Sequence, residues 1–311
     1  MKPQHHMPGT SQQEKNILLT LLYFDIFNYP LTEGEIARFA PGPLTPEFNS
    51  TLANLIDRHV VYRFEDFYSL NKDSSTVDRR KAGNVLAQKK IHTAKKFARL
   101  MASFPFVRAV MLSGSISKDY MDEQSDIDYF IITQSGRLWL MRTAMVLFRR
   151  VFLLNSRKYF CTNYFVGTKN LEIGEKNIYT AVETATLKPM YGKEPVYDFQ
   201  AANAWCNTFL PNRTIENGLG EERDSLLKKV SEKILSLSLF DKLDRWLMEQ
   251  SIKYWKKRYR RLLNEDDFLI AFQSTTHVSR CHPNFYQRKV LAHYTEKIKV
   301  FEQEYGISLS A

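Results

Sequence analysis

The stretch MLSGSISKDYMDEQSDIDYFIIT, Met111 to Thr133, decides which fold the chain adopts. One apolar run, residues 107–112, ends at a Gly-Ser pair, and a second apolar run opens a few residues later behind two aspartates. Short apolar runs bounded by turn residues predict buried strands. We therefore expect two neighbouring strands joined by a turn, with polar side chains gathered where the first ends and the second begins.

These polar side chains predict a site for a metal-bound triphosphate. Asp126 and Asp128 lie one residue apart, so in a strand both side chains point to the same face. Adjacent carboxylates repel unless a cation holds them, and Mg²⁺ takes oxygen ligands while keeping substrate phosphates as co-ligands. Gly114 allows a close backbone approach. Ser115 opens a helical turn whose free N–H groups can receive a phosphate.

The order Leu-Ser-Gly-Ser, a spacer, then Ser-Asp-Ile-Asp-Tyr-Phe resembles the signature of polymerase β-like nucleotidyltransferases. The resemblance covers residues 107–166, about a fifth of the chain. It implies that Ser115 contacts the phosphates and that Asp126 and Asp128 bind catalytic Mg²⁺, with a second metal left open. It also implies transfer of a nucleoside monophosphate from a nucleoside triphosphate, such as ATP, to an acceptor oxygen, with release of pyrophosphate.

The sequence departs from this family at one position. The resemblance implies a third carboxylate on the strand after the next helix, but that stretch, KYFCTNYFVG, contains no acid. Asn163 aligns there, and its neutral oxygen can ligate a metal but is a poor general base. Three hypotheses stay open: an acid from a nearby segment (Glu172, Glu175 or Glu183), a single tightly held metal, or nucleotide binding without turnover.

Several other residues are candidates for the site. Lys118 follows the turn directly, so we expect it to hold the triphosphate. Arg137, Arg142 and Lys188 are further basic candidates, but a solvated surface explains each of them better than a ligand does. In the stretch 253–261 we expect the aromatic residues to pack inward, while a contact of its lysines and arginines with single-stranded nucleic acid or another anionic acceptor stays open. His277, Cys281 and His282 cluster in sequence, but a zinc site needs a fourth ligand, so we do not expect zinc.

Residues 11–72 form the first expected domain, and their order of elements resembles a winged helix-turn-helix module. Helices are expected over 14–28, 32–39 and 47–58, the second opened by a capping box of Thr32 and Glu35, and a hairpin over 60–64 and 67–70. The third helix offers Asn49, Asn54 and Arg58 to DNA but is poor in basic residues. We therefore favour a docking role over nucleic-acid binding, which stays open.

The rest of the chain completes an α+β multidomain protein. We expect a long connecting helix in 73–104, the nucleotidyltransferase core in 105–200 and a helical C-terminal domain in 201–311. Within the core, the stretch 177–192 is expected to form a helix that ends at Pro189 and a turn, with Lys188 at the end of the helix. The rival interpretation of the whole chain is a regulator that senses nucleotides or binds DNA through a degenerate, non-catalytic core.

Composition limits the partners and the location. The chain has 311 residues, 44% of them hydrophobic and 25% charged, which is typical of globular proteins. Its net charge of +10 favours anionic partners: nucleic acid, nucleotides or an acidic membrane surface. Three scattered cysteines, no signal peptide and no transmembrane stretch predict a cytoplasmic protein without a membrane partner. The expected partners are a nucleoside triphosphate and a small-molecule, RNA or protein acceptor.

Overall fold

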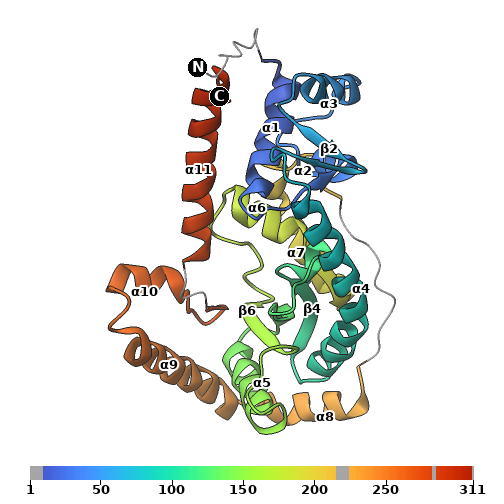
Figure 1. Ribbon diagram of the computed structural model, residues 1–311. Helices are drawn as coiled ribbons and strands as arrows, with labels where there is room; N and C mark the ends of the chain where they lie inside the picture. The colour runs from blue at the N-terminus through green and yellow to red at the C-terminus, as the bar shows by residue number, and fades with distance from the viewer. Residues whose placement is uncertain (1–9, 215–223, 282–284, 310–311) are drawn as a thin grey trace.

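The computed structural model describes residues 10–214, 224–281 and 285–309. Helices surround two separate β-sheets, which confirms the α+β class (Figure 1). None of the described helices combines the length and the apolar character that crossing a membrane requires.

The N-terminal part contains the expected three helices and hairpin. The helices are α1 (Gln12–Asp25), α2 (Glu33–Phe39) and α3 (Phe48–Asp57). The capping box at the start of α2 is confirmed, because the Thr32 side chain accepts from the Glu35 N–H and the Glu35 side chain accepts from the Thr32 N–H. The hairpin strands β2 (Tyr62–Phe64) and β3 (Phe67–Ser69) pair antiparallel, and β1 (Leu31–Thr32), which the sequence did not predict, pairs with β3.

The larger sheet has five strands in the order β7-β4-β5-β6-β8. They are β4 (Val107–Ser113), β5 (Asp128–Thr133), β6 (Cys161–Gly167), β7 (Lys188–Tyr191) and β8 (Val278–Arg280). β5 and β6 are parallel and are connected through α5 (Leu138–Phe152), whereas the other neighbours are antiparallel. The strands predicted from the apolar runs around the Gly-Ser pair are therefore confirmed.

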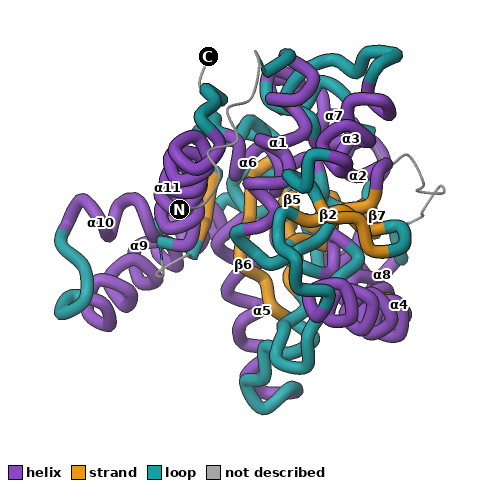
Figure 2. Tube along the Cα trace, turned by 45° about the horizontal axis from the view of Figure 1, so that its top comes forward, coloured by secondary structure: helices purple, strands orange, loops and turns teal. Residues whose placement is uncertain are grey.

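Helices cover both faces of this sheet (Figure 2). Along β4, Val110 and Leu112 join the apolar cluster that includes α4 (Ser75–Ala102), while Ala109 and Met111 join the cluster that includes α7 (Lys193–Ala202). Alternate side chains thus enter different cores, which explains why the strand is apolar throughout.

The helix expected to run from residue 177 to Pro189, with a turn after it, was wrong at its C-terminal end. Helix α6 (Ile178–Ala185) ends before Lys188, and residues 188–191 form β7 instead. Pro189 cannot continue a helix because it has no N–H, but it is tolerated in a strand at the edge of a sheet, and β7 is such a strand. Lys188 therefore lies in a strand and not at the end of a helix.

The C-terminal part is mostly helical but also contributes a strand to the larger sheet. Its helices are α8 (Leu226–Leu235), α9 (Leu239–Tyr259), α10 (Glu265–Ala271) and α11 (Tyr286–Tyr305), and the short helix η2 (Ala204–Thr208) precedes them. Strand β8 pairs with β6 of the core, so a segment that the sequence predicted to be helical is partly strand. The domain limits drawn from the sequence remain predictions.

One apolar cluster joins segments that are far apart in the chain. It contains Ile17 and Leu21 of α1, Val182 of α6, and Val290 and Phe301 of α11. Helices α1 and α11 lie side by side (Figure 1), and the Tyr294 hydroxyl donates to the Leu19 carbonyl over 3.1 Å. The N-terminal helices, the core and the last helix therefore pack against one another.

Candidate functional site

The Gly-Ser turn places backbone and carboxylate in contact. β4 ends at Ser113, which pairs with Asp128 of β5, and the short helix η1 (Ile116–Lys118) follows the turn. Gly114 adopts φ +67°, and a Cβ added to it would lie 2.7 Å from Asp128 Oδ2. Any side chain here would meet both a strained backbone and this carboxylate. Glycine is therefore required where the turn approaches Asp128.

Asp126 and Asp128 lie on either side of a buried isoleucine. Ile127 is fully buried, its N–H donates to the Lys158 carbonyl, and its carbonyl accepts from the Cys161 N–H. This extended backbone turns both aspartates away from the core that receives Ile127. Both are half-buried, and Asp128 lines the large cavity described below. Asp126 is not among the residues that line this cavity, but its negative charge helps to raise the pKa of Asp128.

The carboxyl group of Asp128 is poised to lose its proton near neutral pH. Burial raises its pKa from 3.8 to about 6, with further increases from the charges of Asp126 and Glu183. The neighbouring Cys161 thiol and the charge of Lys118 act in the opposite direction. A buried carboxylate of this kind gains most from a cation that compensates for its lost hydration.

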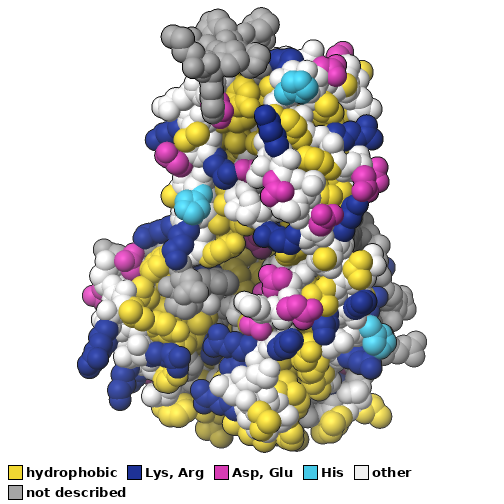
Figure 3. All heavy atoms as spheres, viewed as in Figure 1, with side chains coloured by type: hydrophobic (Ala, Val, Ile, Leu, Met, Phe, Trp, Pro, Cys, Tyr) yellow, Lys and Arg dark blue, Asp and Glu magenta, His cyan; other side chains and the backbone are white. Residues whose placement is uncertain are grey.

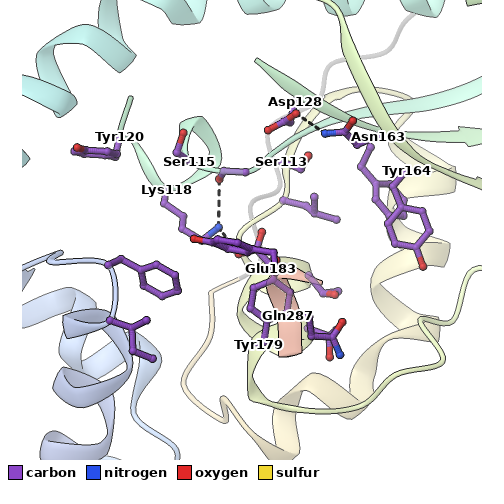
Figure 4. A pocket seen from close by; sticks show the side chains of 18 of the residues that line it. Ser113, Ser115, Lys118, Tyr120, Asp128, Asn163, Tyr164, Tyr179, Glu183 and Gln287 are labelled. Carbon is purple, nitrogen blue, oxygen red and sulfur yellow. Dashed lines mark hydrogen bonds and ion pairs between the residues drawn. The ribbon is translucent and has the colours of Figure 1, made fainter. Parts of the chain in front are cut away.

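Asn163 holds Asp128 from the neighbouring strand. The register of β5 and β6 shifts so that Thr162 pairs with Tyr129 and Tyr164 with Phe130, which leaves Asn163 in a bulge. Its Nδ2 donates to Asp128 Oδ1 over 2.6 Å (Figure 4). Its Oδ1 accepts from the Cys161 thiol over 3.2 Å. The amide thus presents its nitrogen, and not its oxygen, to Asp128.

Lys118 is shared between the turn and an acid from α6. Its Nζ lies 2.8 Å from Glu183 Oε1 and donates to the Gly114 carbonyl over 3.2 Å (Figure 4). Its own carbonyl accepts from the Tyr29 hydroxyl over 2.6 Å, which ties η1 to the N-terminal helices. The basic group predicted to hold phosphates is therefore at the site, but it is already ion-paired.

A cavity of about 950 Å³ extends from this turn. This is near the upper end of the range for ligand pockets, roughly 300–1,000 Å³. Four parts of the chain line it: residues 23–29 near the N-terminus, Arg79 of α4, the core from Ser113 to Leu187, and the C-terminal segment with Arg280 and Tyr286. In Figure 3 the surface is hollowed near its centre, with hydrophobic side chains in the depression.

The candidate site residues fall into two groups, those that line the cavity and those that do not. Gly114, Ser115, Lys118, Asp128 and Asn163 all line the cavity, and so do two of the alternative acids, Glu175 and Glu183. The third, Glu172, is exposed and pairs with Lys176. The further basic candidates are engaged elsewhere: Arg137 pairs with Asp241, Arg142 stacks on Trp255, and Lys188 pairs with Asp119.

Sequence reasoning missed most of the cavity wall. Tyr23, Tyr179, Arg280 and Tyr286 come from four segments with no common motif, so no local pattern could have grouped them. Arg280 lies almost fully buried and pairs with Glu175 over 3.0 Å. Its position depends on β8, the strand that the sequence did not predict.

The donor set suits one divalent cation bound together with phosphates. In the described part of the chain, no group of three or more His, Cys, Asp or Glu residues is arranged to hold a metal ion. Mg²⁺ is often held by only one or two carboxylates plus substrate phosphates, which Asp126 and Asp128 can supply. Of the sequence cluster His277, Cys281 and His282, where we did not expect zinc, His282 lies outside the described residues.

Comparisons with known proteins assign no relatives: no family model, no curated protein and no solved structure matches this chain.

Proposed function

We propose that the protein is a Mg²⁺-dependent nucleotidyltransferase that moves a nucleoside monophosphate from a nucleoside triphosphate to an acceptor oxygen. The observation that carries the proposal is the contact between the Gly114 turn and Asp128 at the wall of a large cavity. The acceptor is a small molecule, an RNA or a protein, and we expect the reaction in the cytoplasm. In this proposal residues 11–72 form a winged-helix-like module that supplies one wall of the cavity.

Asp126 and Asp128 are the residues that would hold Mg²⁺ supplied as its complex with the triphosphate, with phosphate oxygens completing the coordination. When bound, Mg²⁺ neutralises charge on the phosphates and on the leaving pyrophosphate. Asn163 keeps the Asp128 carboxylate in place through the 2.6 Å hydrogen bond from its amide nitrogen.

Lys118 and Glu183 have complementary roles in the proposed reaction. A phosphate bound near Ser115 would compete with Glu183 for the Lys118 ammonium. Glu183, released from its partner, would accept the proton of the acceptor hydroxyl. The acceptor oxygen then forms a bond to the α-phosphorus, the bond between that phosphorus and the bridging oxygen breaks, and pyrophosphate leaves with the bonding electrons. Glu183 would thereby supply the carboxylate that is missing from β6.

The proposal is tested by nucleotide binding and pyrophosphate release. We expect the purified full chain to bind at least one of the four nucleoside triphosphates with Mg²⁺, and Asp128→Ala to weaken this binding at least about tenfold. With a suitable acceptor, pyrophosphate release should depend on Asp126 and Asp128. Glu172→Gln, which changes an exposed acid outside the cavity, is the matched control. Equal nucleotide binding by the parent chain and Asp128→Ala would refute the proposed site.

A nucleotide-binding regulator without turnover is the second candidate. Asn163 favours it, because the residue at the expected third acid is a neutral donor to Asp128. Tight, Asp128-dependent nucleotide binding without pyrophosphate release for any acceptor class would support this candidate over transfer.

The DNA-binding form of the regulator has less support. Arg58, the residue that caps the end of α3, pairs with Glu14 of α1 over 2.6 Å and also contacts Asn54. Two of the three side chains that could contact DNA are therefore engaged within the protein. Salt-dependent binding of the full chain to duplex DNA, measured by fluorescence anisotropy, would restore this form of the regulator.

A further inference from the structure

Helix α8 packs on the protein through its charged residues. Lys228 is buried, and its Nζ donates to the Val107 carbonyl over 2.9 Å and pairs with Asp224 over 2.7 Å. One turn later, Glu232 accepts from the Phe106 N–H and pairs with Arg108, both over 2.7 Å. Residues four apart lie on the same face of a helix, so these two charged residues define the inner face of α8.

The opposite face of α8 is apolar and exposed. The large aliphatic side chains on it and just after it, with their exposed fractions, are Leu226 (81%), Leu227 (77%), Val230 (56%), Ile234 (57%), Leu237 (60%) and Leu239 (68%). At 3.6 residues per turn, Leu226, Val230, Ile234 and Leu237 form one stripe. Figure 3 shows hydrophobic side chains along the lower edge of the molecule, where Figure 1 places α8.

This orientation reverses the usual one. A surface helix of a globular protein normally turns its apolar stripe toward the core and its charged residues toward water. Each exposed leucine forgoes about 1.5–3 kcal/mol of burial energy. An uncovered stripe of this size marks a surface that becomes covered by something else.

The charges around the stripe identify what covers it. Among the described residues 224–245, three acids are paired: Asp224 with Lys228, Glu232 with Arg108, and Asp241 with Arg137. The fourth, Asp244, is buried and accepts from the Leu140 N–H. The exposed basic side chains are Lys229, Lys233, Lys242 and Arg245, and none of them forms an ion pair with any residue that the structure describes. The outward surface therefore combines six aliphatic and four cationic side chains. These ten residues lie on α8, just after it and on the first turns of α9, and we call them together the outer face of α8.

Against the sequence-based expectation of no membrane partner, we propose that the outer face of α8 binds the surface of an anionic lipid membrane. The aliphatic stripe would enter the boundary between headgroups and acyl chains, and the four basic side chains would meet the lipid phosphates, as interfacial amphipathic helices do. A second copy of the chain would bring like charges together at this face, and a nucleic acid would leave the leucines exposed. The contact is peripheral and does not depend on the proposed transferase activity.

Vesicle co-sedimentation tests the proposal. The full chain should sediment with vesicles of phosphatidylcholine mixed with phosphatidylglycerol, should bind phosphatidylcholine vesicles much more weakly, and should be released by salt. The double variant Leu227→Asp, Ile234→Asp should lose binding to both vesicles. The double variant Lys229→Glu, Lys233→Glu should lose at least about tenfold in affinity, and only toward the anionic vesicles.

Matched variants on α11 provide the controls. Val300→Asp and Lys299→Glu change exposed residues far from α8 (Figure 1) and should bind vesicles like the parent chain. Circular dichroism of each variant separates loss of binding from loss of folding. Failure to bind anionic vesicles, or binding that survives Leu227→Asp, Ile234→Asp, overturns the proposal. A dimer in sedimentation velocity that the same double variant converts to a monomer also overturns it, because the face would then join two copies.

Discussion

At the scale of single residues, the site depends on one carboxylate kept in an unfavourable place. Asp128 is half-buried beside a second acid, and it is held by the amide of Asn163 and not by a cation of the protein. Buried carboxylates cost stability unless they are compensated. A protein retains such a group when a ligand supplies the compensation, so both the stability and the ligand binding of this chain should respond to pH around Asp128.

We predict that Asp128→Asn stabilises the ligand-free protein at pH 8. The pKa of Asp128 is raised to about 6 by burial, so between about pH 4 and 6 the folded state binds more protons than the unfolded state. The stability contributed by this group is fully present below the unfolded pKa and is lost as pH rises through 6. Urea unfolding should show a gain of about 2 kcal/mol for the variant at pH 8 and little difference at pH 4. A variant less stable than the parent at pH 8 would contradict this account.

The same titration should govern nucleotide binding. A Mg–triphosphate complex needs the ionised carboxylate, so its affinity should fall about tenfold between pH 7 and pH 5 for a group with a pKa of about 6. Isothermal titration calorimetry at the two pH values, with the non-titrating Asp128→Asn variant for comparison, measures this difference. An equal loss of affinity in Asp128→Asn would assign the pH dependence to another group.

Glu183→Gln should affect binding and turnover in opposite directions. The change frees Lys118 from its 2.8 Å ion pair, so Mg–ATP affinity should rise, by about fivefold for a partly exposed pair. It also removes the proposed proton acceptor, so transfer should fall by about 10²-fold or more. Calorimetry and pyrophosphate release measure the two effects separately, with Glu172→Gln as the control. Weaker nucleotide binding in Glu183→Gln would show that Glu183 does not compete with the phosphates.

At the scale of elements, the edge of the larger sheet depends on the junction between β7 and α7. Gly192 has φ +87°, and a Cβ added to it would lie 1.9 Å from the Arg108 carbonyl oxygen and 2.8 Å from the Ala109 Cα. Both atoms belong to β4, which runs directly into the Gly114 turn. Close packing of this junction therefore helps to fix the strand that carries the site.

Gly192→Ala should destabilise the fold by more than backbone strain alone. Gly136 has a similar φ of +81° but no atom within 4 Å of its added Cβ, so Gly136→Ala isolates the strain, about 1–2 kcal/mol. Gly192→Ala adds a collision with backbone, and we expect it to cost at least about 2 kcal/mol more. Urea unfolding of both variants measures the difference. Equal losses would mean that β4 and β7 can separate without cost.

At the scale of the whole molecule, the cavity exists only because distant segments meet. Residues 23–29, the core and the segment around Tyr286 each supply part of its wall, and one apolar cluster connects α1, α6 and α11. Binding in the cavity should therefore stabilise all three parts together. The outer face of α8 lies in a different part of the chain, residues 226–245, from the cavity walls. Membrane binding and nucleotide binding should therefore be separable by mutation.

We predict that saturating Mg–nucleotide raises the melting temperature of the whole chain in a single transition. A ligand at about 100 times its dissociation constant adds about 2.7 kcal/mol to the free energy of unfolding. Differential scanning calorimetry should show the shift in the parent chain and not in Asp128→Ala. Two separate transitions, with only one of them shifted, would mean that the N-terminal helices do not contribute to the ligand site.

The sequence by itself determined the features that depend on neighbouring residues. The Thr32–Glu35 capping box, the hairpin at residues 62–69 and the strands on either side of Gly114 follow from local spacing and chemistry, and they were predicted correctly. The chain also brings five of the six predicted site residues, Gly114, Ser115, Lys118, Asp128 and Asn163, to one cavity, whereas the sixth, Asp126, is not among the lining residues. Their catalytic roles remain predictions.

The tertiary structure alone decided what surrounds these residues. Strand β7 replaced a predicted helical segment because a sheet edge was available to accept Pro189. Glu183 was one of three acids that could replace the missing carboxylate, and its ion pair with Lys118 distinguished it from the other two. The apolar stripe of α8 has the spacing of an ordinary core-facing helix, but in the structure it points outward. Local spacing specifies which face of an element is apolar, but only packing between distant segments specifies what that face meets.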